Sequence, residues 1–109
     1  ISLLSWLDEN FTEEITLKML SDITGYREKY ICRIFKEYTS RTPINYINEL
    51  RIEKACHEIS ENNFSVTHAA YDSGFNDLSY FCRLFKDYKG VTPTQYRNLT
   101  ATNKFTNDI

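Results

Sequence analysis

The chain has 109 residues, of which 41% are hydrophobic and 26% charged, and its formal net charge is −2. This length allows one modest domain or two very small lobes, and it excludes a large enzyme cleft. No apolar run approaches the roughly 18 residues of a membrane span, and no secretory signal pattern is present. We therefore expect a cytoplasmic protein.

Apolar residues recur at helical spacing along the chain, which predicts an all-α fold. Leu3, Leu7 and Phe11 form the first apolar stripe. Thr16 is then suited to cap a short helix that Gly25 ends. A stronger amphipathic helix follows this glycine, with basic residues on its polar side.

This stronger helix occurs twice in the chain. Residues 30–38, YICRIFKEY, return as residues 80–88, YFCRLFKDY, and each copy is followed by Thr-Pro and a tyrosine at the same offsets. So strict a repeat indicates one helical unit used twice. We expect its aromatic rings in the core. The predicted buried faces are Tyr30 or Ile31, Ile34, Phe35 and Tyr38 in the first copy, and Phe81, Leu84, Phe85 and Tyr88 in the second.

The two copies differ at the residue that precedes this helix. Asp77 is suited to the N-cap of the second copy, because its carboxylate accepts hydrogen bonds from unpaired backbone N–H groups. Arg27 occupies the equivalent position of the first copy and cannot accept such bonds. The sequence therefore predicts that the first copy starts its helix less cleanly.

A long helix is predicted between the copies. Pro43 favours a helix start, and helical spacing continues to Ser60. The predicted organisation is seven or so helices, with a first lobe over residues 1–42, a linker helix over 43–60 and a second lobe over 61–97. After Pro93 we expect a short helix through Tyr96, and then a polar tail, residues 98–109, that is disordered.

A short helix, a glycine turn and a basic amphipathic helix together resemble a helix-turn-helix, whose second helix usually reads the DNA major groove. The acidic total charge argues against nucleic-acid binding, but the charge is unevenly distributed. Residues 27–41 hold five basic and two acidic residues, and residues 77–97 hold four basic and two acidic ones. Each candidate recognition helix is therefore locally basic.

The repeated cations are the candidate contacts. Arg33 and Arg83 are expected to contact base edges or phosphates, with a salt bridge to a neighbouring acid as the alternative. Lys36 and Lys86 are expected to contact phosphates, with an ordinary solvated charge as the alternative. The remaining candidate phosphate contacts are Arg27, Arg41 and Lys89.

No catalytic or metal-binding pattern was found. The three cysteines are far apart in the sequence and the two histidines are isolated, so neither a disulfide framework nor a zinc site is expected. Cys32 and Cys82 occupy equivalent positions, which suggests a redox role. We favour the interpretation that they are small groove-facing residues, because basic neighbours do not by themselves make a thiol a redox sensor. We expect no cofactor, no metal and no enzymatic activity.

The sequence is similar to the DNA-binding domain of the AraC/XylS family of bacterial transcription regulators. The segments that carry the resemblance are Gly25-Tyr26, Tyr30-x-x-Arg33-x-Phe35-Lys36, Ile47-x-x-x-Arg51-Ile52-x-x-Ala55, Gly74-Phe75-Asn76-Asp77-x-x-Tyr80-Phe81-x-Arg83-x-Phe85-Lys86 and Gly90-x-Thr92-Pro93-x-x-Tyr96-Arg97. The resemblance implies two helix-turn-helix lobes joined by a long helix, with one recognition helix per lobe in successive major grooves. The base-reading positions it implies are Lys29, Cys32, Arg33, Leu78, Ser79, Cys82 and Arg83.

The leading prediction is sequence-specific binding of double-stranded DNA in bacterial transcription regulation, at the nucleoid when bound. The resemblance implies RNA polymerase as a partner, and an additional effector or dimerisation domain ahead of this one. The alternative is an acidic helical protein-interaction module without DNA affinity. Salt dependence of binding separates the two, because only phosphate contacts release counterions.

Overall fold

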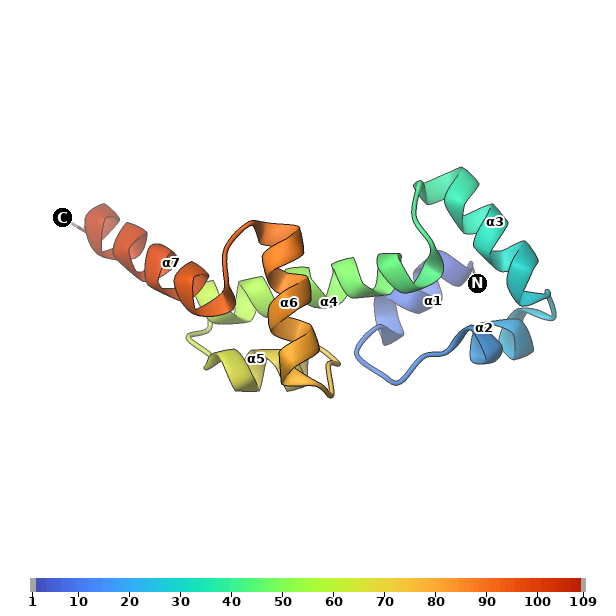
Figure 1. Ribbon diagram of the computed structural model, residues 1–109, viewed down its shortest axis with the longest axis horizontal. Coiled ribbons are helices and arrows are strands. Elements are labelled where there is room, and N and C mark those ends of the chain that lie inside the picture. Colours follow the sequence, from blue (N-terminus) through green and yellow to red (C-terminus); the bar gives the residue numbers. More distant parts are fainter. Residues whose placement is uncertain (1, 109) are drawn as a thin grey trace. The chain divides into compact units, whose positions relative to one another are not determined.

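The computed structural model describes residues 2–108, and side chains through residue 102. The regular elements in this range are all α-helices (Figure 1): α1 (Leu3–Asn10), α2 (Leu17–Thr24), α3 (Glu28–Thr39), α4 (Pro43–Ser60), α5 (Val66–Asp72), α6 (Leu78–Lys89) and α7 (Pro93–Asp108). The chain divides between Arg51 and Ile52 into two compact units, here called the N-terminal and C-terminal units. No helix in the described range is long and apolar enough to cross a bilayer.

The N-terminal unit packs α1, α2, α3 and the first half of α4 around one small core. Its buried side chains are Leu7, Leu20, Ile31, Phe35 and Ile47. The Thr16 hydroxyl caps α2 by accepting a hydrogen bond from Met19 N at 3.1 Å. Gly25 ends α2 in the left-handed conformation, with φ 76°, so that the chain can turn into α3.

Arg51 fastens the loop between α1 and α2 to α4. Its Nε donates a hydrogen bond to the Phe11 carbonyl at 2.6 Å, and its second terminal nitrogen donates one to the Glu13 carbonyl at 2.7 Å. These bonds satisfy two carbonyl groups that no helix pairs. The guanidinium is thus used for structure within the N-terminal unit.

The C-terminal unit repeats this arrangement with α5, α6, the second half of α4 and α7. The Ser65 hydroxyl caps α5 by accepting from His68 N at 3.1 Å, and Gly74 has φ 106° in the turn before α6. Helix α6 packs against both α5 and α7. The core consists of Ile52, Ala55, Cys56, Ile59, Ala69, Ala70, Phe75, Phe81 and Phe85.

Helix α4 contributes to both cores. It runs without a break from Pro43 to Ser60, the range predicted for the linker helix. Ile47 belongs to the N-terminal core, whereas Ile52, Ala55 and Ile59 belong to the C-terminal core. Each unit therefore includes part of α4, and neither core is complete without residues of this helix.

The predicted difference between the starts of the two repeated helices is confirmed. The Asp77 carboxylate accepts a hydrogen bond from Tyr80 N at 3.0 Å and caps α6. Arg27 stands at the N-cap of α3 and makes no side-chain capping bond. The first turn of α3 lacks the stabilisation of about 1 kcal/mol that such a cap typically provides.

The expectation that all repeated aromatic rings lie in the core was wrong for the tyrosines. Tyr38 is 80% exposed and Tyr88 39%, and of the alternatives Tyr30 and Ile31 it is Ile31 that is buried, with Tyr30 40% exposed. Each unit is so small that α3 and α6 bury only two side chains apiece, four residues apart. Tyrosine tolerates the surface because its hydroxyl keeps its hydration there.

Helix α7 is longer than predicted. It continues to Asp108, so residues 98–108 are helical where the sequence analysis placed a disordered tail, and Ile109 lies outside the described residues. No glycine or proline follows Pro93 to end the helix. The Thr100 hydroxyl, which donates to the Tyr96 carbonyl at 3.0 Å, makes its side-chain hydrogen bond within the helix.

A charged cluster joins α4 to α5 within the C-terminal unit. Lys54 Nζ donates hydrogen bonds to Glu58 and, at 2.8 Å, to Asp72 Oδ2. Burial raises the pKa of Glu58, whose side chain is only 5% exposed. The hydrogen bond from Lys54 lowers the pKa of Asp72, and the same bond raises that of Lys54. The lysine thus compensates a carboxylate that burial disfavours.

Candidate nucleic-acid interface

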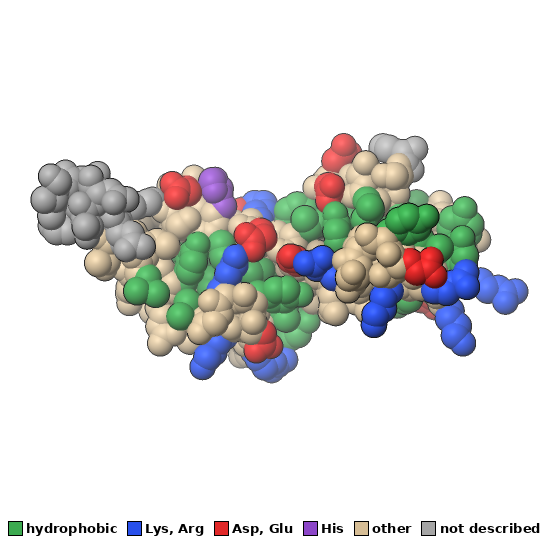
Figure 2. All heavy atoms as spheres, turned by 90° about the horizontal axis from the view of Figure 1, so that it is seen from above, with side chains coloured by type: hydrophobic (Ala, Val, Ile, Leu, Met, Phe, Trp, Pro, Cys, Tyr) green, Lys and Arg blue, Asp and Glu red, His purple; other side chains and the backbone are tan. Residues whose placement is uncertain are grey.

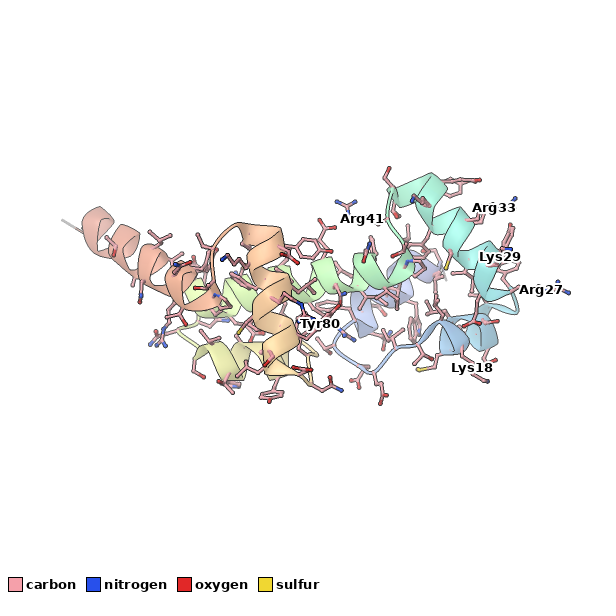
Figure 3. The ribbon with its side chains drawn as sticks, viewed as in Figure 1. Lys18, Arg27, Lys29, Arg33, Arg41 and Tyr80 are labelled. Carbon is pink, nitrogen blue, oxygen red and sulfur yellow. The ribbon has the colours of Figure 1, made fainter. Side chains whose placement is uncertain are left out.

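Each unit contains a helix-turn-helix whose second helix presents cations on its exposed side. In the N-terminal unit, α2 packs against α3, and Lys29, Arg33 and Lys36 lie four and three residues apart on one exposed face of α3. Arg27 precedes this face. Arg27, Lys29 and Arg33 extend outward from α3 (Figure 3).

The C-terminal unit presents the same face with fewer cations. Ser79, Arg83 and Lys86 are exposed on α6 and correspond in register to the three cations of α3. The serine replaces one charge. The C-terminal face thus carries fewer cations than the N-terminal one, although their spacing is the same.

These cations have no acidic partner in the part of the chain that the structure describes. Ion pairs there involve Lys18, Arg41, Lys54 and Lys89, and none reaches the exposed cations of α3 and α6. We call the following set the open cations: Arg27, Lys29, Arg33, Lys36, Arg83 and Lys86. A group of like charges held without counter-ions favours an anionic ligand. Figure 2 shows Lys and Arg side chains projecting over the end of the N-terminal unit where α3 lies.

Two predicted phosphate contacts are engaged inside their own units. Arg41 pairs with Glu49, and its guanidinium also donates to the Thr39 carbonyl at 3.0 Å. Lys89 Nζ lies 2.5 Å from Glu53 Oε1, and that hydrogen bond raises the pKa of Lys89. A phosphate would have to displace these carboxylates, so both residues are weaker candidates than the sequence indicated.

Three predicted base-reading residues point less outward than expected. Leu78 and Cys82 are half-buried and pack against the C-terminal core, and Cys32 is half-buried at the equivalent place in α3. Apolar and thiol side chains gain by lying against a core. Lys29, Arg33, Ser79 and Arg83 are the exposed members of the base-reading set.

The structure adds a feature to both faces that the sequence analysis missed. The Arg33 guanidinium carbon lies 5.3 Å from the ring centroid of Tyr30, and that of Arg83 lies 5.4 Å from the ring centroid of Tyr80. Both pairs are cation–π contacts between residues i and i+3 of a helix. The repeated Tyr-x-x-Arg spacing was the available signal.

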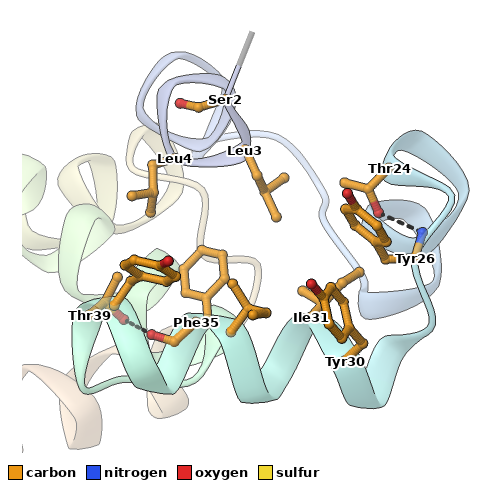
Figure 4. Close-up of a pocket in the computed structure, with 11 residues that line it drawn as sticks. Ser2, Leu3, Leu4, Thr24, Tyr26, Tyr30, Ile31, Phe35 and Thr39 are labelled. Atoms are coloured by element: carbon orange, nitrogen blue, oxygen red, sulfur yellow. Dashed lines mark hydrogen bonds between the residues drawn. The ribbon is translucent and has the colours of Figure 1, made fainter.

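An apolar groove of about 380 Å³ runs beside α3 on the N-terminal unit (Figure 4). Leu3 and Leu4 of α1 line one side, and Ile34 and Tyr38 of α3 are among the residues that line the other. Tyr30 lines this groove and also borders an open hollow lined with Arg27, Lys29 and Arg33. Its ring thus lies between the apolar and the basic surfaces.

Two other kinds of site were considered within the described residues, a reactive thiol and a metal centre. Burial raises the pKa of the Cys56 thiol to about 11, which keeps it protonated and unreactive at neutral pH. Within the described residues, no group of three His, Cys, Asp or Glu side chains is arranged to hold a metal ion.

A family model of a helix-turn-helix domain matches residues 20–99, well over half of the chain. The chain belongs to the AraC/XylS family. It is 36% identical over 75 residues to the HTH-type transcriptional activator RhaS of Enterobacter sp. (strain 638), a match that covers 69% of this chain. The match spans only 27% of the length of that curated relative.

Solved structures support the same AraC-type architecture of two helical lobes. The C-terminal domain of the two-component response regulator yesN from Fusobacterium nucleatum subsp. nucleatum ATCC 25586 has a TM-score of 0.81 at 29% identity, covering 86% of this chain and 92% of that chain. The DNA-binding domain of AdpA, in complex with a target DNA, has a TM-score of 0.86 at 20% identity, covering 92% and 90%. This second likeness is one of fold.

Proposed function

We propose that this AraC-type domain binds double-stranded DNA sequence-specifically and regulates transcription. The observation that carries the proposal is the pair of helix-turn-helix units whose second helices present open cations at the same register. Helices α3 and α6 are then the recognition helices. Each enters its own major groove, so the binding site consists of two half-sites.

The exposed residues of the two helices divide into two roles. Arg33 and Arg83 contact base edges, where an arginine pairs with guanine O6 and N7. Lys36 and Lys86 contact phosphates, together with Arg27 at the start of α3. Lys29 and Ser79, near the N-terminal ends of their helices, complete the base contacts.

Partners beyond DNA follow from the regulatory role. RNA polymerase is the proposed partner of the DNA-bound protein, and the proposed place of action is the bacterial cytoplasm, at the nucleoid. The curated relatives extend well beyond the matched span, which supports an effector or dimerisation domain in the intact regulator. The family is one of DNA-binding domains of transcription regulators, not of enzymes.

A protein-interaction module without DNA affinity is the second candidate, and the apolar groove on the N-terminal unit favours it. Salt separates the two functions. Phosphate contacts give a steep fall of affinity with ionic strength, because each contact releases condensed counterions, whereas an apolar interface does not.

The test is a selection of bound sequences from random double-stranded DNA with the purified chain, followed by titration of the selected site at several salt concentrations. Enrichment of a two-part motif, with affinity that falls steeply as salt rises, is the expected result. Enrichment of no motif, with binding no tighter than to unselected DNA, would refute sequence-specific recognition.

A further inference from the structure

The guanidinium groups of Arg33 and Arg83 share one environment in the two units. Each lies over the ring of the tyrosine three residues earlier, at 5.3 Å in α3 and 5.4 Å in α6. Helical Cα–Cβ bonds tilt toward the N-terminus, so the arginine side chain runs back over the preceding turn and reaches that ring. It is thereby directed toward the end of the helix that meets base edges in a helix-turn-helix.

The tyrosines are themselves supported from the turn that precedes each helix. The rings of Tyr26 and Tyr30 have centroids 5.0 Å apart, and those of Phe75 and Tyr80 have centroids 6.3 Å apart. Each unit thus has a row of three groups: an aromatic ring of the turn, a tyrosine and an arginine. The supports differ in burial, because Phe75 is 4% exposed and Tyr26 is 56% exposed.

We infer that Tyr30 and Tyr80 are positioning residues that hold Arg33 and Arg83 in their DNA-contacting orientation. The inference rests on the proposed function and deepens it. A free arginine side chain loses much rotamer freedom when it binds, and a guanidinium already held on a ring loses less. The tyrosines therefore increase affinity for the specific site through the arginines, without contacting a base themselves.

Substitutions of the two tyrosines separate this role from a structural one. Tyr30→Leu and Tyr80→Leu keep apolar bulk and remove the ring, so each should weaken binding to the selected site by about two- to five-fold, the range of an exposed cation–π contact. Tyr30→Phe and Tyr80→Phe keep the ring and should bind like the wild type. Tyr38→Leu is the matched control, because Tyr38 is an exposed tyrosine of α3 without a cation–π contact to Arg33 or Arg83.

A double-mutant cycle supplies the decisive comparison. In an Arg83→Ala background, Tyr80→Leu should cost nothing further, since its effect passes through the arginine. Equal losses in both backgrounds would overturn the inference, and the same holds for Tyr30 with Arg33.

A spectroscopic test does not depend on DNA at all. In the free protein, ring currents should shift the side-chain proton resonances of Arg33 and Arg83 upfield of their random-coil values, and the leucine variants should abolish these shifts while the phenylalanine variants keep them. Absence of the shifts in the wild type would overturn the positioning role even if DNA binding is confirmed. Shifts without specific DNA binding would instead refute the proposed function.

Discussion

Lys86 and Lys89 offer a direct test of whether an open cation differs from a paired one. Both belong to the last turns of α6 and both were candidate phosphate contacts. Lys86 has no ion pair among the described residues, whereas Lys89 Nζ lies 2.5 Å from Glu53 Oε1. We predict that Lys86→Gln weakens the salt dependence of DNA binding and that Lys89→Gln leaves it nearly unchanged.

The magnitude follows from counting phosphate contacts. Each neutralised phosphate contributes about −0.9 to the slope of log affinity against log salt concentration. With the three phosphate contacts proposed above, Arg27, Lys36 and Lys86, the slope is about −2.7, and it would reach about −5.4 if all six open cations contacted phosphates. Removing Lys86 should make the slope less negative by about 0.9. The charge of Lys89 is already balanced by Glu53, so Lys89 neutralises no phosphate and its removal should leave the slope unchanged.

The assay is fluorescence anisotropy of a labelled selected site, titrated with each variant at several salt concentrations between about 50 and 300 mM, the range in which counterion release is measurable. Lys36→Gln and Arg41→Gln repeat the comparison in the N-terminal unit, where Arg41 pairs with Glu49. Equal reductions of the slope for Lys86→Gln and Lys89→Gln would refute the reasoning from ion pairs.

Further changes test specificity, the shared helix and the charged cluster. Arg33→Ala should cost about 1–3 kcal/mol on the selected site and relax the preference at one base position, as should the same change at its counterpart in α6. Leu50→Pro should break α4 at a cost of about 3 kcal/mol and lower affinity for the two-part site toward that of one half-site. Lys54→Met should destabilise the C-terminal unit by about 1–3 kcal/mol at neutral pH, because the buried Glu58 loses its cation. The difference in stability between Lys54→Met and the wild type should shrink in acid. Glu58 protonates at its raised pKa and then no longer needs a cation. The stabilisation that Asp72 gives the wild type through Lys54 is lost as the pH falls through the lowered pKa of Asp72.

Each of these changes has its own measurement and control. The base preference of Arg33→Ala is measured by repeating the sequence selection after circular dichroism has verified folding. An unchanged motif and affinity would show that Arg33 does not contact DNA. Footprinting of Leu50→Pro should show partial protection, so undiminished protection of both half-sites would argue against coupling through α4. Urea unfolding at several pH values measures the Lys54 variants, and Lys54→Arg should retain most of the stability if charge is what matters.

The order of helices and most helix ends could be predicted because local chemistry decides them. Thr16, Gly25, Pro43 and Asp77 act through backbone groups of their own turn, so spacing alone shows their effect. The end of α7 was misjudged because polarity was taken for disorder, although nothing in residues 98–108 stops a helix.

The side-chain partners of the candidate site were harder to predict. Whether Lys89 or Lys86 is open depends on Glu53, which is distant in sequence and is brought near by the packing of α4 with α6. The exposure of the repeated tyrosines depends on how many positions a very small core can bury, and helical period does not give that number. The contact of Arg33 with Tyr30 is local, and its spacing was visible in the repeat.

Because α4 supplies side chains to both cores, the folding of the two units is linked. Unfolding of the C-terminal core would leave residues 52–60 of α4 without packing, and a helical segment so short is marginal in water by itself. Loss of helix there would fray the half that carries Ile47, so the N-terminal core would weaken in turn. The free energy of unfolding of the chain should thus be the sum of one contribution from each unit and one from the coupling between them, as for adjacent repeats of a solenoid. A ligand held by one unit would raise the melting temperature of the other, and occupation of one half-site would stabilise the unit that has not yet bound.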